Sequence, residues 1–296
     1  MIVPGRIRFQ HAVVYVGRPL LLLFAWDLLI TVAYLAKGMG TSYISFPSLP
    51  LPLLGSAIAI YLTFRNTAAY GRWWEARVLW GAMTNYSRSF CREVQTLLPP
   101  DTLALQRQLV LRHVAYVHAL RLHLLRQQPW TELAPYLPPH EVARLRRVAN
   151  VPNAIMNETA KIIVRRASLD NVRLTTIEAT MRELLNAQGG MERIRNTPLP
   201  QQYSTYPALF THAFCALLPL GLVESLGIFT PLGSTAVGFL FLALLQIGKD
   251  MEHPFSNTVH DVPLTAITHA IEIDLRDSLG DEHELKPAQA CKGVLW

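Results

Sequence analysis

The boundary between an apolar run and an Arg/Trp-rich segment constrains this chain more than any other feature. Residues 58–77 read IAIYLTFRNTAAYGRWWEAR, and the apolar stretch reaches back to about residue 46. A helix of a soluble protein would bury such a run along one side and then turn away. Here the run passes directly into the pair Trp73–Trp74, and the arginines at the boundary are Arg65, Arg72 and Arg77. Aromatic belts and an arginine excess mark the cytoplasmic edge of a membrane, so the sequence predicts a membrane protein.

Composition agrees with a membrane setting. The 296 residues are 51% hydrophobic and only 16% charged, below the roughly 25% charge that is usual for soluble domains. A net charge of +6 would suggest a nucleic-acid partner in a soluble protein. Here the basic residues flank apolar spans, so topology explains them and no nucleic-acid partner is expected. Cys91, Cys215 and Cys291 are far apart and form no CxxC, so no disulfide framework is predicted.

Four apolar segments are each near the roughly 20 residues needed to cross a bilayer core. They cover residues 19–36, 46–64, 207–226 and 228–248. A single residue, Gly227, separates the last two segments, which predicts a tight helical hairpin. Basic residues precede the first segment and fill the long region after the second. Both termini and that region are therefore predicted to be cytoplasmic, with the spans in the bacterial inner membrane.

The long region between the second and third segments has helical spacing rather than the composition of a linker. Apolar residues recur with a helical period in residues 75–98, 102–127, 139–148, 153–167 and 170–188. Asp101 is the expected N-cap of the second of these helices, and Gly189–Gly190 are expected to close the last. The predicted fold class is all-α. The predicted division is an N-terminal cytoplasmic segment with two spans (1–64), a cytoplasmic helical region (65–206), two further spans (207–248) and a cytoplasmic C-terminal segment (249–296).

Ionisable residues inside the apolar segments are the next candidates for function. Asp27 is costly there unless it faces protein or water, so it is either functional or a buried hydrogen-bond partner. His212 and Glu224 do not share a helix face. The histidines of the middle region, His113, His118 and His123, are spaced by five rather than by the four that pairs ligands on a helix. We therefore expect no metal site, no cofactor and no catalytic residue.

A stripe on the second apolar segment has the spacing of a pore lining. Ser56, Ile60 and Phe64 lie at i, i+4 and i+8, roughly along one helix face. Around a shared axis these side chains would form stacked rings, and apolar rings in a narrow pore limit permeation by dewetting. The alternative is that the stripe packs against a neighbouring helix.

The motifs beyond this stripe resemble those of a known family. RNTAAYGRWWEAR followed by WGAMTNYSR, then GGMERIRNTPLPQQY and HPFSNTVHDVPL, resemble the bestrophin family in its prokaryotic branch, over nearly the whole chain. The Arg72–Trp73–Trp74–Glu75 run is among the more specific of these motifs. The resemblance implies a homopentameric ion channel with one central pore. It places Ile60 and Phe64 in the hydrophobic neck and Ser56 at the outermost ring, where an apolar residue is usual.

The resemblance also implies a second constriction and raises the question of calcium. The constriction is one apolar ring on the helix before the Gly-Gly motif, and Ile177 is the residue chosen for it, with Leu174 as the alternative. Animal bestrophins bind calcium through an acidic run that matches residues 253–261 here. Only Asp261 is acidic in that stretch, and Ca²⁺ needs six to eight oxygen ligands. Calcium activation is therefore not expected, and Asp261 is predicted to be the N-cap of the following helix.

The resulting hypothesis is a pore-forming channel that passes small monovalent ions passively. The family is known for chloride-type anion conduction in animals, and prokaryotic relatives can prefer cations, so the sign of the ion stays open. The alternatives are a membrane-anchored helical scaffold or enzyme, for which no polar cluster is evident, and a proton-coupled transporter. Secondary transporters typically have broken helices in two related halves, and four spans without an internal repeat do not match that pattern.

Overall fold

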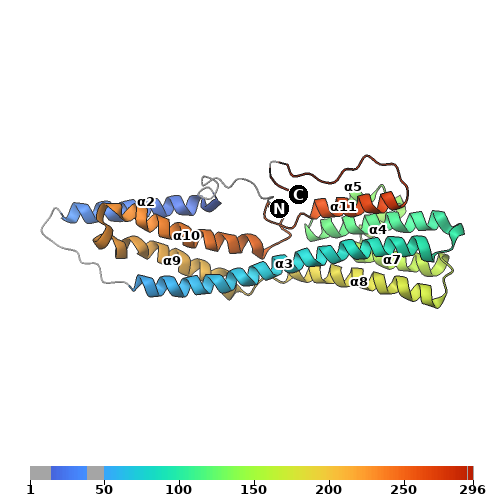
Figure 1. Cartoon of the computed structure of the whole chain (residues 1–296), viewed down its shortest axis with the longest axis horizontal. Coiled ribbons are helices and arrows are strands. Elements are labelled where there is room, and N and C mark those ends of the chain that lie inside the picture. The colour runs from blue at the N-terminus through green and yellow to red at the C-terminus, as the bar shows by residue number, and fades with distance from the viewer. Residues whose placement is uncertain (1–14, 39–49, 292, 296) are drawn as a thin grey trace. The chain divides into compact units, whose positions relative to one another are not determined.

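The described chain is built from helices (Figure 1). The computed structural model describes residues 15–38, 50–291 and 293–295. Its elements are α2 (Arg18–Gly38), α3 (Leu51–Leu97), η1 (Pro100–Thr102), α4 (Leu103–Leu124), α5 (Trp130–Leu133), α6 (Pro139–Leu145), α7 (Val151–Arg166), α8 (Asn171–Asn196), α9 (Gln201–Leu226), η2 (Gly227–Phe229), α10 (Thr230–Glu252) and α11 (Leu264–Ser278). In these residues, β-structure is limited to an isolated bridge between Cys291 and Val294. The predicted all-α class is confirmed.

Three of the four predicted apolar segments coincide with helices. Residues 19–36 lie in α2, residues 207–226 in α9 and residues 228–248 largely in α10, and the short η2 joins the last two as the predicted hairpin. The second segment differs, because α3 begins at Leu51 and continues unbroken to Leu97. The start of that segment, residues 46–49, lies outside the described residues. No proline interrupts α3 after Pro52, so the apolar stretch and the predicted helix 75–98 form one helix.

The described chain divides into two compact units. The hairpin unit comprises residues 15–38, 50–72 and 198–252, and the bundle unit comprises residues 73–197, 253–291 and 293–295. The division falls within α3, between Arg72 and Trp73. In the described residues, two stretches are long and apolar enough to cross a membrane: Arg18–Ala36 and Gln201–Glu252, the second of which contains both α9 and α10.

The hairpin unit packs α2, α9 and α10 against one another. A Cβ added at Gly238 of α10 would lie 2.2 Å from Leu23 Cδ2, so the glycine permits a close approach of α2. Asp27 of α2 is fully buried, and its two carboxylate oxygens accept hydrogen bonds from Ser234 Oγ at 2.9 Å and Thr235 Oγ1 at 2.8 Å. Of the two interpretations of Asp27, the structure supports the buried hydrogen-bond partner.

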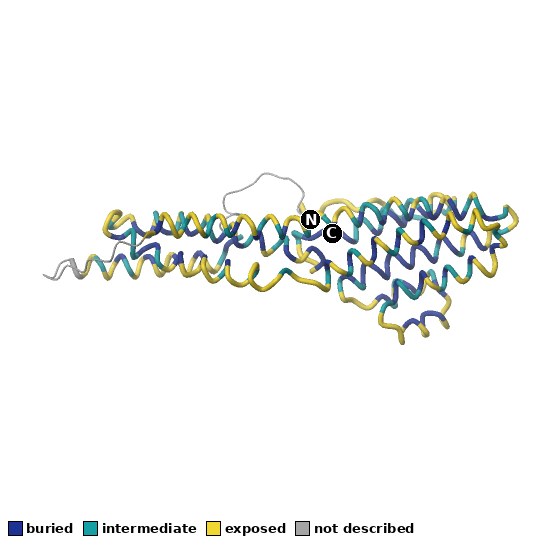
Figure 2. Tube along the Cα trace, turned by 90° about the horizontal axis from the view of Figure 1, so that it is seen from below, coloured by how far each residue is buried: buried dark blue, intermediate teal, exposed yellow. Residues whose placement is uncertain are grey.

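The bundle unit is organised around α4. Most residues of this helix are buried, and α7, α8 and α11 all pack against it. Figure 2 shows buried residues, in dark blue, along the helices of this unit. His113 of α4 is among its buried residues, and its Nε2 lies 2.9 Å from Ser87 Oγ. Burial lowers the pKa of His113 to about 3, so the ring is neutral and acts as a packing residue.

Two local predictions in this unit are wrong. Asp101 does not cap α4: it lies in the 3₁₀ turn η1, and the N-cap position is Thr102, whose hydroxyl donates to the Pro99 carbonyl at 2.6 Å. Gly189–Gly190 do not close α8, which continues through both to Asn196. A Cβ at Gly190 would lie 2.8 Å from Leu79 Cδ1. This glycine therefore serves close packing of α8 on α3 rather than helix termination.

A polar cluster attaches α11 to α4. The buried His118 of α4 has Nδ1 2.9 Å from Glu132 Oε2 and Nε2 2.9 Å from Glu272 Oε2. Glu272 of α11 also accepts from Tyr136 at 2.5 Å and from Arg276 Nε at 2.9 Å. Burial by itself would raise the pKa of Glu272, but the hydrogen bonds from His118 and Tyr136 and the nearby positive charges outweigh it and lower the pKa to about 2.

Acid is expected to weaken the attachment of α11. Because the folded-state pKa of Glu272 lies below its ordinary value of 4.5, the ionised carboxylate stabilises the fold above pH 4.5, and that stabilisation is lost as the pH falls from 4.5 toward 2. Thermal unfolding of the purified chain across this window should show a falling midpoint. Glu272→Gln should flatten the decline, while Glu282→Gln, at an exposed position, should not. An unchanged decline in Glu272→Gln would contradict this role.

Candidate ion-permeation site

The predicted neck residues share an exposed face of α3. Ile60 is 58% exposed and Phe64 is 63% exposed. Ser56 is also exposed, and its hydroxyl donates to the Pro52 carbonyl one turn earlier at 2.7 Å. In the described chain these side chains therefore lie on the surface of the unit rather than against its core. Such a face is available to line an axis shared by several copies.

The opposite face of α3 is buried. Leu62, Arg65 and Ala69 are each at most 1% exposed, and their spacing of three and four places them on one side of the helix. The packing of this buried face therefore fixes the rotation of α3 about its own axis. This rotation sets the direction in which Ile60 and Phe64 point.

A buried ion pair fixes that rotation. Arg65 Nη2 donates to Glu252 Oε2 of α10 at 2.9 Å, with side chains only 1% and 8% exposed. Arg65 Nη1 donates to the Leu245 carbonyl at 3.1 Å, and Arg72 Nε donates to the Glu252 carbonyl at 3.2 Å. We call Arg65, Arg72 and Glu252 the α3–α10 clamp. Because Arg65 follows Phe64 directly in sequence, the clamp also restrains the position of Phe64, a predicted neck residue.

The close approach of the two helices at the clamp requires a glycine. A Cβ at Gly248 of α10 would lie 2.1 Å from Asn66 Oδ1 and 2.2 Å from Arg65 Nη1. Asn66 also contacts α10, where its Nδ2 donates to the Leu244 carbonyl at 3.0 Å.

Sequence reasoning missed the clamp. It used Arg65 and Arg72 as markers of the cytoplasmic edge of the membrane and did not single out Glu252. The available signal was the spacing of the two arginines, since seven positions place them on one helix face.

The other residues of the specific motif lie in the bundle unit. Trp73 is partly buried and its Nε1 donates to the His260 carbonyl at 3.1 Å. Trp74 is 53% exposed. Glu75 forms an ion pair with Arg193 of α8. The motif therefore combines a helix clamp, a packing tryptophan and a surface ion pair.

The two residues considered for the inner constriction differ in burial. Ile177 of α8 is 0% exposed and belongs to the core of the bundle unit. This burial within the single chain favours the alternative over Ile177. Leu174, the alternative, is partly buried and packs at the edge of the same core.

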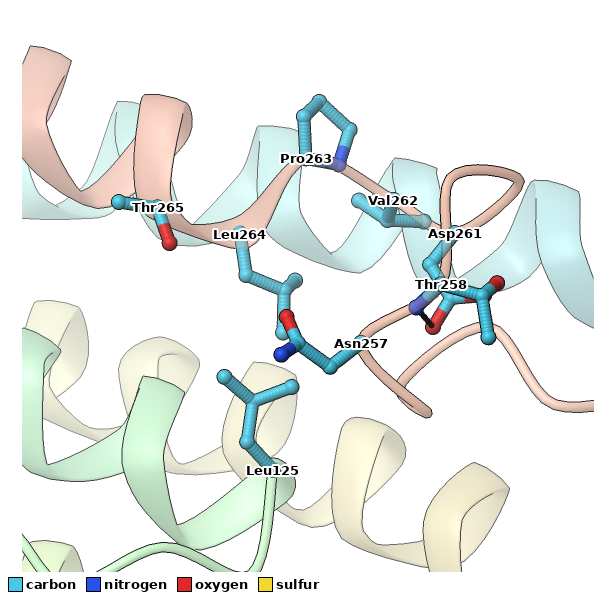
Figure 3. A pocket seen from close by; sticks show the side chains of 8 residues that line it. All are labelled: Leu125, Asn257, Thr258, Asp261, Val262, Pro263, Leu264 and Thr265. Carbon is cyan, nitrogen blue, oxygen red and sulfur yellow. Dashed lines mark hydrogen bonds between the residues drawn. The ribbon is translucent and has the colours of Figure 1, made fainter. Parts of the chain in front are cut away.

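The stretch that matches the calcium-binding run forms a loop organised by Asp261 (Figure 3). Its carboxylate accepts from the Ser256 N–H at 2.5 Å, the Thr258 N–H at 3.2 Å and the Thr258 hydroxyl at 2.5 Å. Asp261 is therefore not the N-cap of α11, a position that Pro263 occupies. Its hydrogen bonds point into its own loop, which they close.

The surroundings of this loop leave room for little more than a water molecule. In Figure 3 the Asn257 amide points toward Leu125 and Leu264 across a cavity of about 10 Å³, which is about the space of one water molecule. Glu252, the acidic residue just before this stretch, forms an ion pair with Arg65. Among the residues that the structure describes, no group of three or more His, Cys, Asp or Glu side chains could hold a metal ion.

Comparison with known proteins identifies the family. Residues 11–277 match the family described as Bacterial/Fungal Bestrophin protein. This chain belongs to the bestrophin family. The voltage-dependent anion channel-forming protein of Ralstonia nicotianae is 39% identical over 249 residues, which cover 81% of each chain. The protein of the same description from Escherichia coli, YneE, is 37% identical over 246 residues, covering 82% of this bestrophin and 80% of that protein.

Solved structures agree with the sequence relatives. A bacterial bestrophin homologue from Klebsiella pneumoniae has a TM-score of 0.84 at 29% identity, covering 90% of this bestrophin and 98% of that chain. A single-residue variant of it has a TM-score of 0.83 at 30% identity, covering 90% and 99%. The resemblance seen in the motifs is confirmed. Because the curated relatives are described as channel-forming proteins, the prediction of a channel-family protein rather than an enzyme is confirmed as well.

Proposed function

We propose that this bestrophin forms a homopentameric channel in the bacterial inner membrane and passes small monovalent ions down their gradient. The helices α2, α9 and α10 and the start of α3 span the bilayer, and both termini lie in the cytoplasm. Residues 65–206 and 249–296 form the cytoplasmic part, and 1–64 and 207–248 hold the spans. Chloride-type anions are the proposed ions, because the curated relatives are described as anion channel-forming proteins.

The observation that carries this proposal is the arrangement of the two faces of α3. Ile60 and Phe64 are large, apolar and well exposed on one face, while a buried ion pair holds the opposite face. Within a single chain, the exposed parts of Ile60 and Phe64 pack against no other residue. Around a five-fold axis, the same face supplies stacked rings of Ser56, Ile60 and Phe64, and the apolar rings restrict permeation by dewetting.

The proposed inner constriction moves to Leu174. It lies about one turn before Ile177 on α8 and keeps part of its side chain at the surface. Neither apolar ring selects the sign of the ion, which depends on polar and charged groups along the conduit.

Flux through purified channels in liposomes tests the neck. Phe64→Ala should raise ion flux by about tenfold or more, which corresponds to lowering the barrier by roughly 1.4 kcal/mol. Phe229→Ala is the matched control, since Phe229 is 68% exposed on η2 and lies away from α3 in the sequence. Reversal potentials under asymmetric potassium chloride then give the sign of the permeating ion.

Two outcomes would overturn the proposal. If neither wild type nor Phe64→Ala passes ions, the chain does not form the proposed channel. If Phe229→Ala raises flux as much as Phe64→Ala, the neck does not lie at Phe64. A reversal potential that follows potassium would replace the anion by a cation and leave the neck in place.

A further inference from the structure

The bundle unit holds a polar cavity that the proposed conduction pathway does not use. It lies where α4 ends and α5 and α7 begin, and its volume is about 340 Å³. That volume falls in the lower part of the range of small-molecule sites. The side chains that matter for its chemistry are His123, Arg126, Gln127, Gln128, Trp130 and Arg146.

The lining of the cavity is basic, although His123 already has an acidic partner, since its Nε2 lies 3.7 Å from Glu192 Oε1. His123, Arg126 and Arg146 line the cavity, and no acidic side chain does so in the described residues. Neither arginine forms an ion pair with a carboxylate in the part of the chain that the structure describes. The Arg146 guanidinium lies 5.1 Å from the centre of the Trp130 ring, a cation–π contact that orients the group without neutralising it.

A helix N-terminus adds to the positive potential. Val151, the first residue of α7, lines the cavity, and α7 is 16 residues long. The N-terminal end of such a helix carries a partial positive charge. The facing end of α4 offers few free carbonyls, because Arg121, Leu122 and His123 already accept backbone hydrogen bonds from the residues that follow the helix.

Arg126 stands at a helix-end position that glycine usually occupies. Gln127 N–H donates to the Leu122 carbonyl at 2.8 Å and Arg126 N–H to the His123 carbonyl at 3.1 Å, which is the Schellman arrangement at a helix end. Arg126 occupies the left-handed position with φ 57°, where glycine is strongly preferred and other residues are strained. The local fold would therefore be satisfied better by glycine.

We propose that this cavity binds a phosphate monoester of small-metabolite size. The guanidinium groups of Arg126 and Arg146 would hold the phosphate, because arginine binds phosphate oxygens with paired N–H donors. The cavity exceeds the size of phosphate alone, and the amides of Gln127 and Gln128 offer donors and acceptors to hydroxyl groups on the rest of the molecule. The site is independent of the proposed conduction pathway.

Binding to the full-length protein in detergent tests the site without any measurement of flux. Titration calorimetry should show that glucose 6-phosphate binds, glucose does not, and inorganic phosphate binds more weakly than the ester. Arg126→Gly should weaken binding of glucose 6-phosphate by about tenfold or more, which matches the loss of a charged hydrogen-bond partner. Because glycine relieves the strained backbone, this variant should unfold at the same temperature or higher.

A neighbouring arginine provides the control. Arg147→Gln removes an exposed cation that does not line the cavity, and it should leave binding unchanged. No binding of glucose 6-phosphate at millimolar concentration would overturn the proposal. So would equal weakening by Arg147→Gln, which would indicate attraction to the general positive surface, or binding that survives in Arg126→Gly.

Discussion

Replacing Glu252 with alanine is expected to destabilise the folded chain by about 3–5 kcal/mol, because it leaves the Arg65 guanidinium buried without its counter-charge. Arg65 is 1% exposed, its Nε has no hydrogen-bond partner, and the Leu245 carbonyl that Nη1 contacts carries no full charge to replace the carboxylate. A loss of this size is a large part of the 5–15 kcal/mol that stabilises a typical domain. Thermal unfolding in detergent, followed by loss of the monodisperse peak in size-exclusion chromatography, measures it.

The paired replacement separates charge from packing. Arg65→Met combined with Glu252→Leu removes both charges and should be much less destabilised than Glu252→Ala alone, since apolar pairs often replace buried ion pairs at little cost. The same double variant should disturb ion flux, because the clamp that sets the rotation of α3 is gone. Equal destabilisation of the single and double variants would show that the ion pair is not what holds these helices together.

Glu141→Ala is expected to have a comparable effect in the bundle unit. Arg112 Nη1 and Nη2 donate to the two oxygens of Glu141 at 2.6 and 2.8 Å, and the side chains are 1% and 7% exposed. Removing the carboxylate leaves a buried guanidinium with only the Thr159 hydroxyl at 3.3 Å from its Nε, a loss of about 3–5 kcal/mol. The midpoint of thermal unfolding should fall by several degrees or more.

An exposed pair provides the contrast. Asp274 lies 2.6 Å from Arg88, with side chains 38% and 55% exposed, and Asp274→Ala should cost only about 0–1 kcal/mol. If the two alanine variants unfold at the same temperature, burial is not what makes the Arg112–Glu141 pair important.

The class of the fold was readable from the sequence because it depends on local patterns. Helical periodicity and apolar run length predicted α2, α9, α10 and most of the bundle helices closely. Gly189–Gly190 misled because glycine has two uses: it ends helices and it lets helices approach, and only the position of Leu79 decides between them. Asp101 and Asp261 misled for a similar reason, since an acid before a helix caps it only when its carboxylate faces the first turn.

The candidate site was predictable in part. The stripe of Ser56, Ile60 and Phe64 follows from spacing on one helix, and the structure places these residues on an exposed face. Whether they line a pore depends on copies of the chain that a single sequence does not describe. Ile177 could not be judged from α8 alone, because the neighbours of α8 in space bury it. The partners of Arg65 were hidden for the same reason, since Glu252 lies far away in sequence.

The glycine at position 248 has a consequence for the history of this family. Any larger side chain there would occupy the space of the Arg65 guanidinium and the Asn66 amide. We therefore expect a larger residue at 248 only in sequences where residues 65 and 66 have both become shorter or moved away. Positions 65, 66 and 248 are thus expected to covary among relatives.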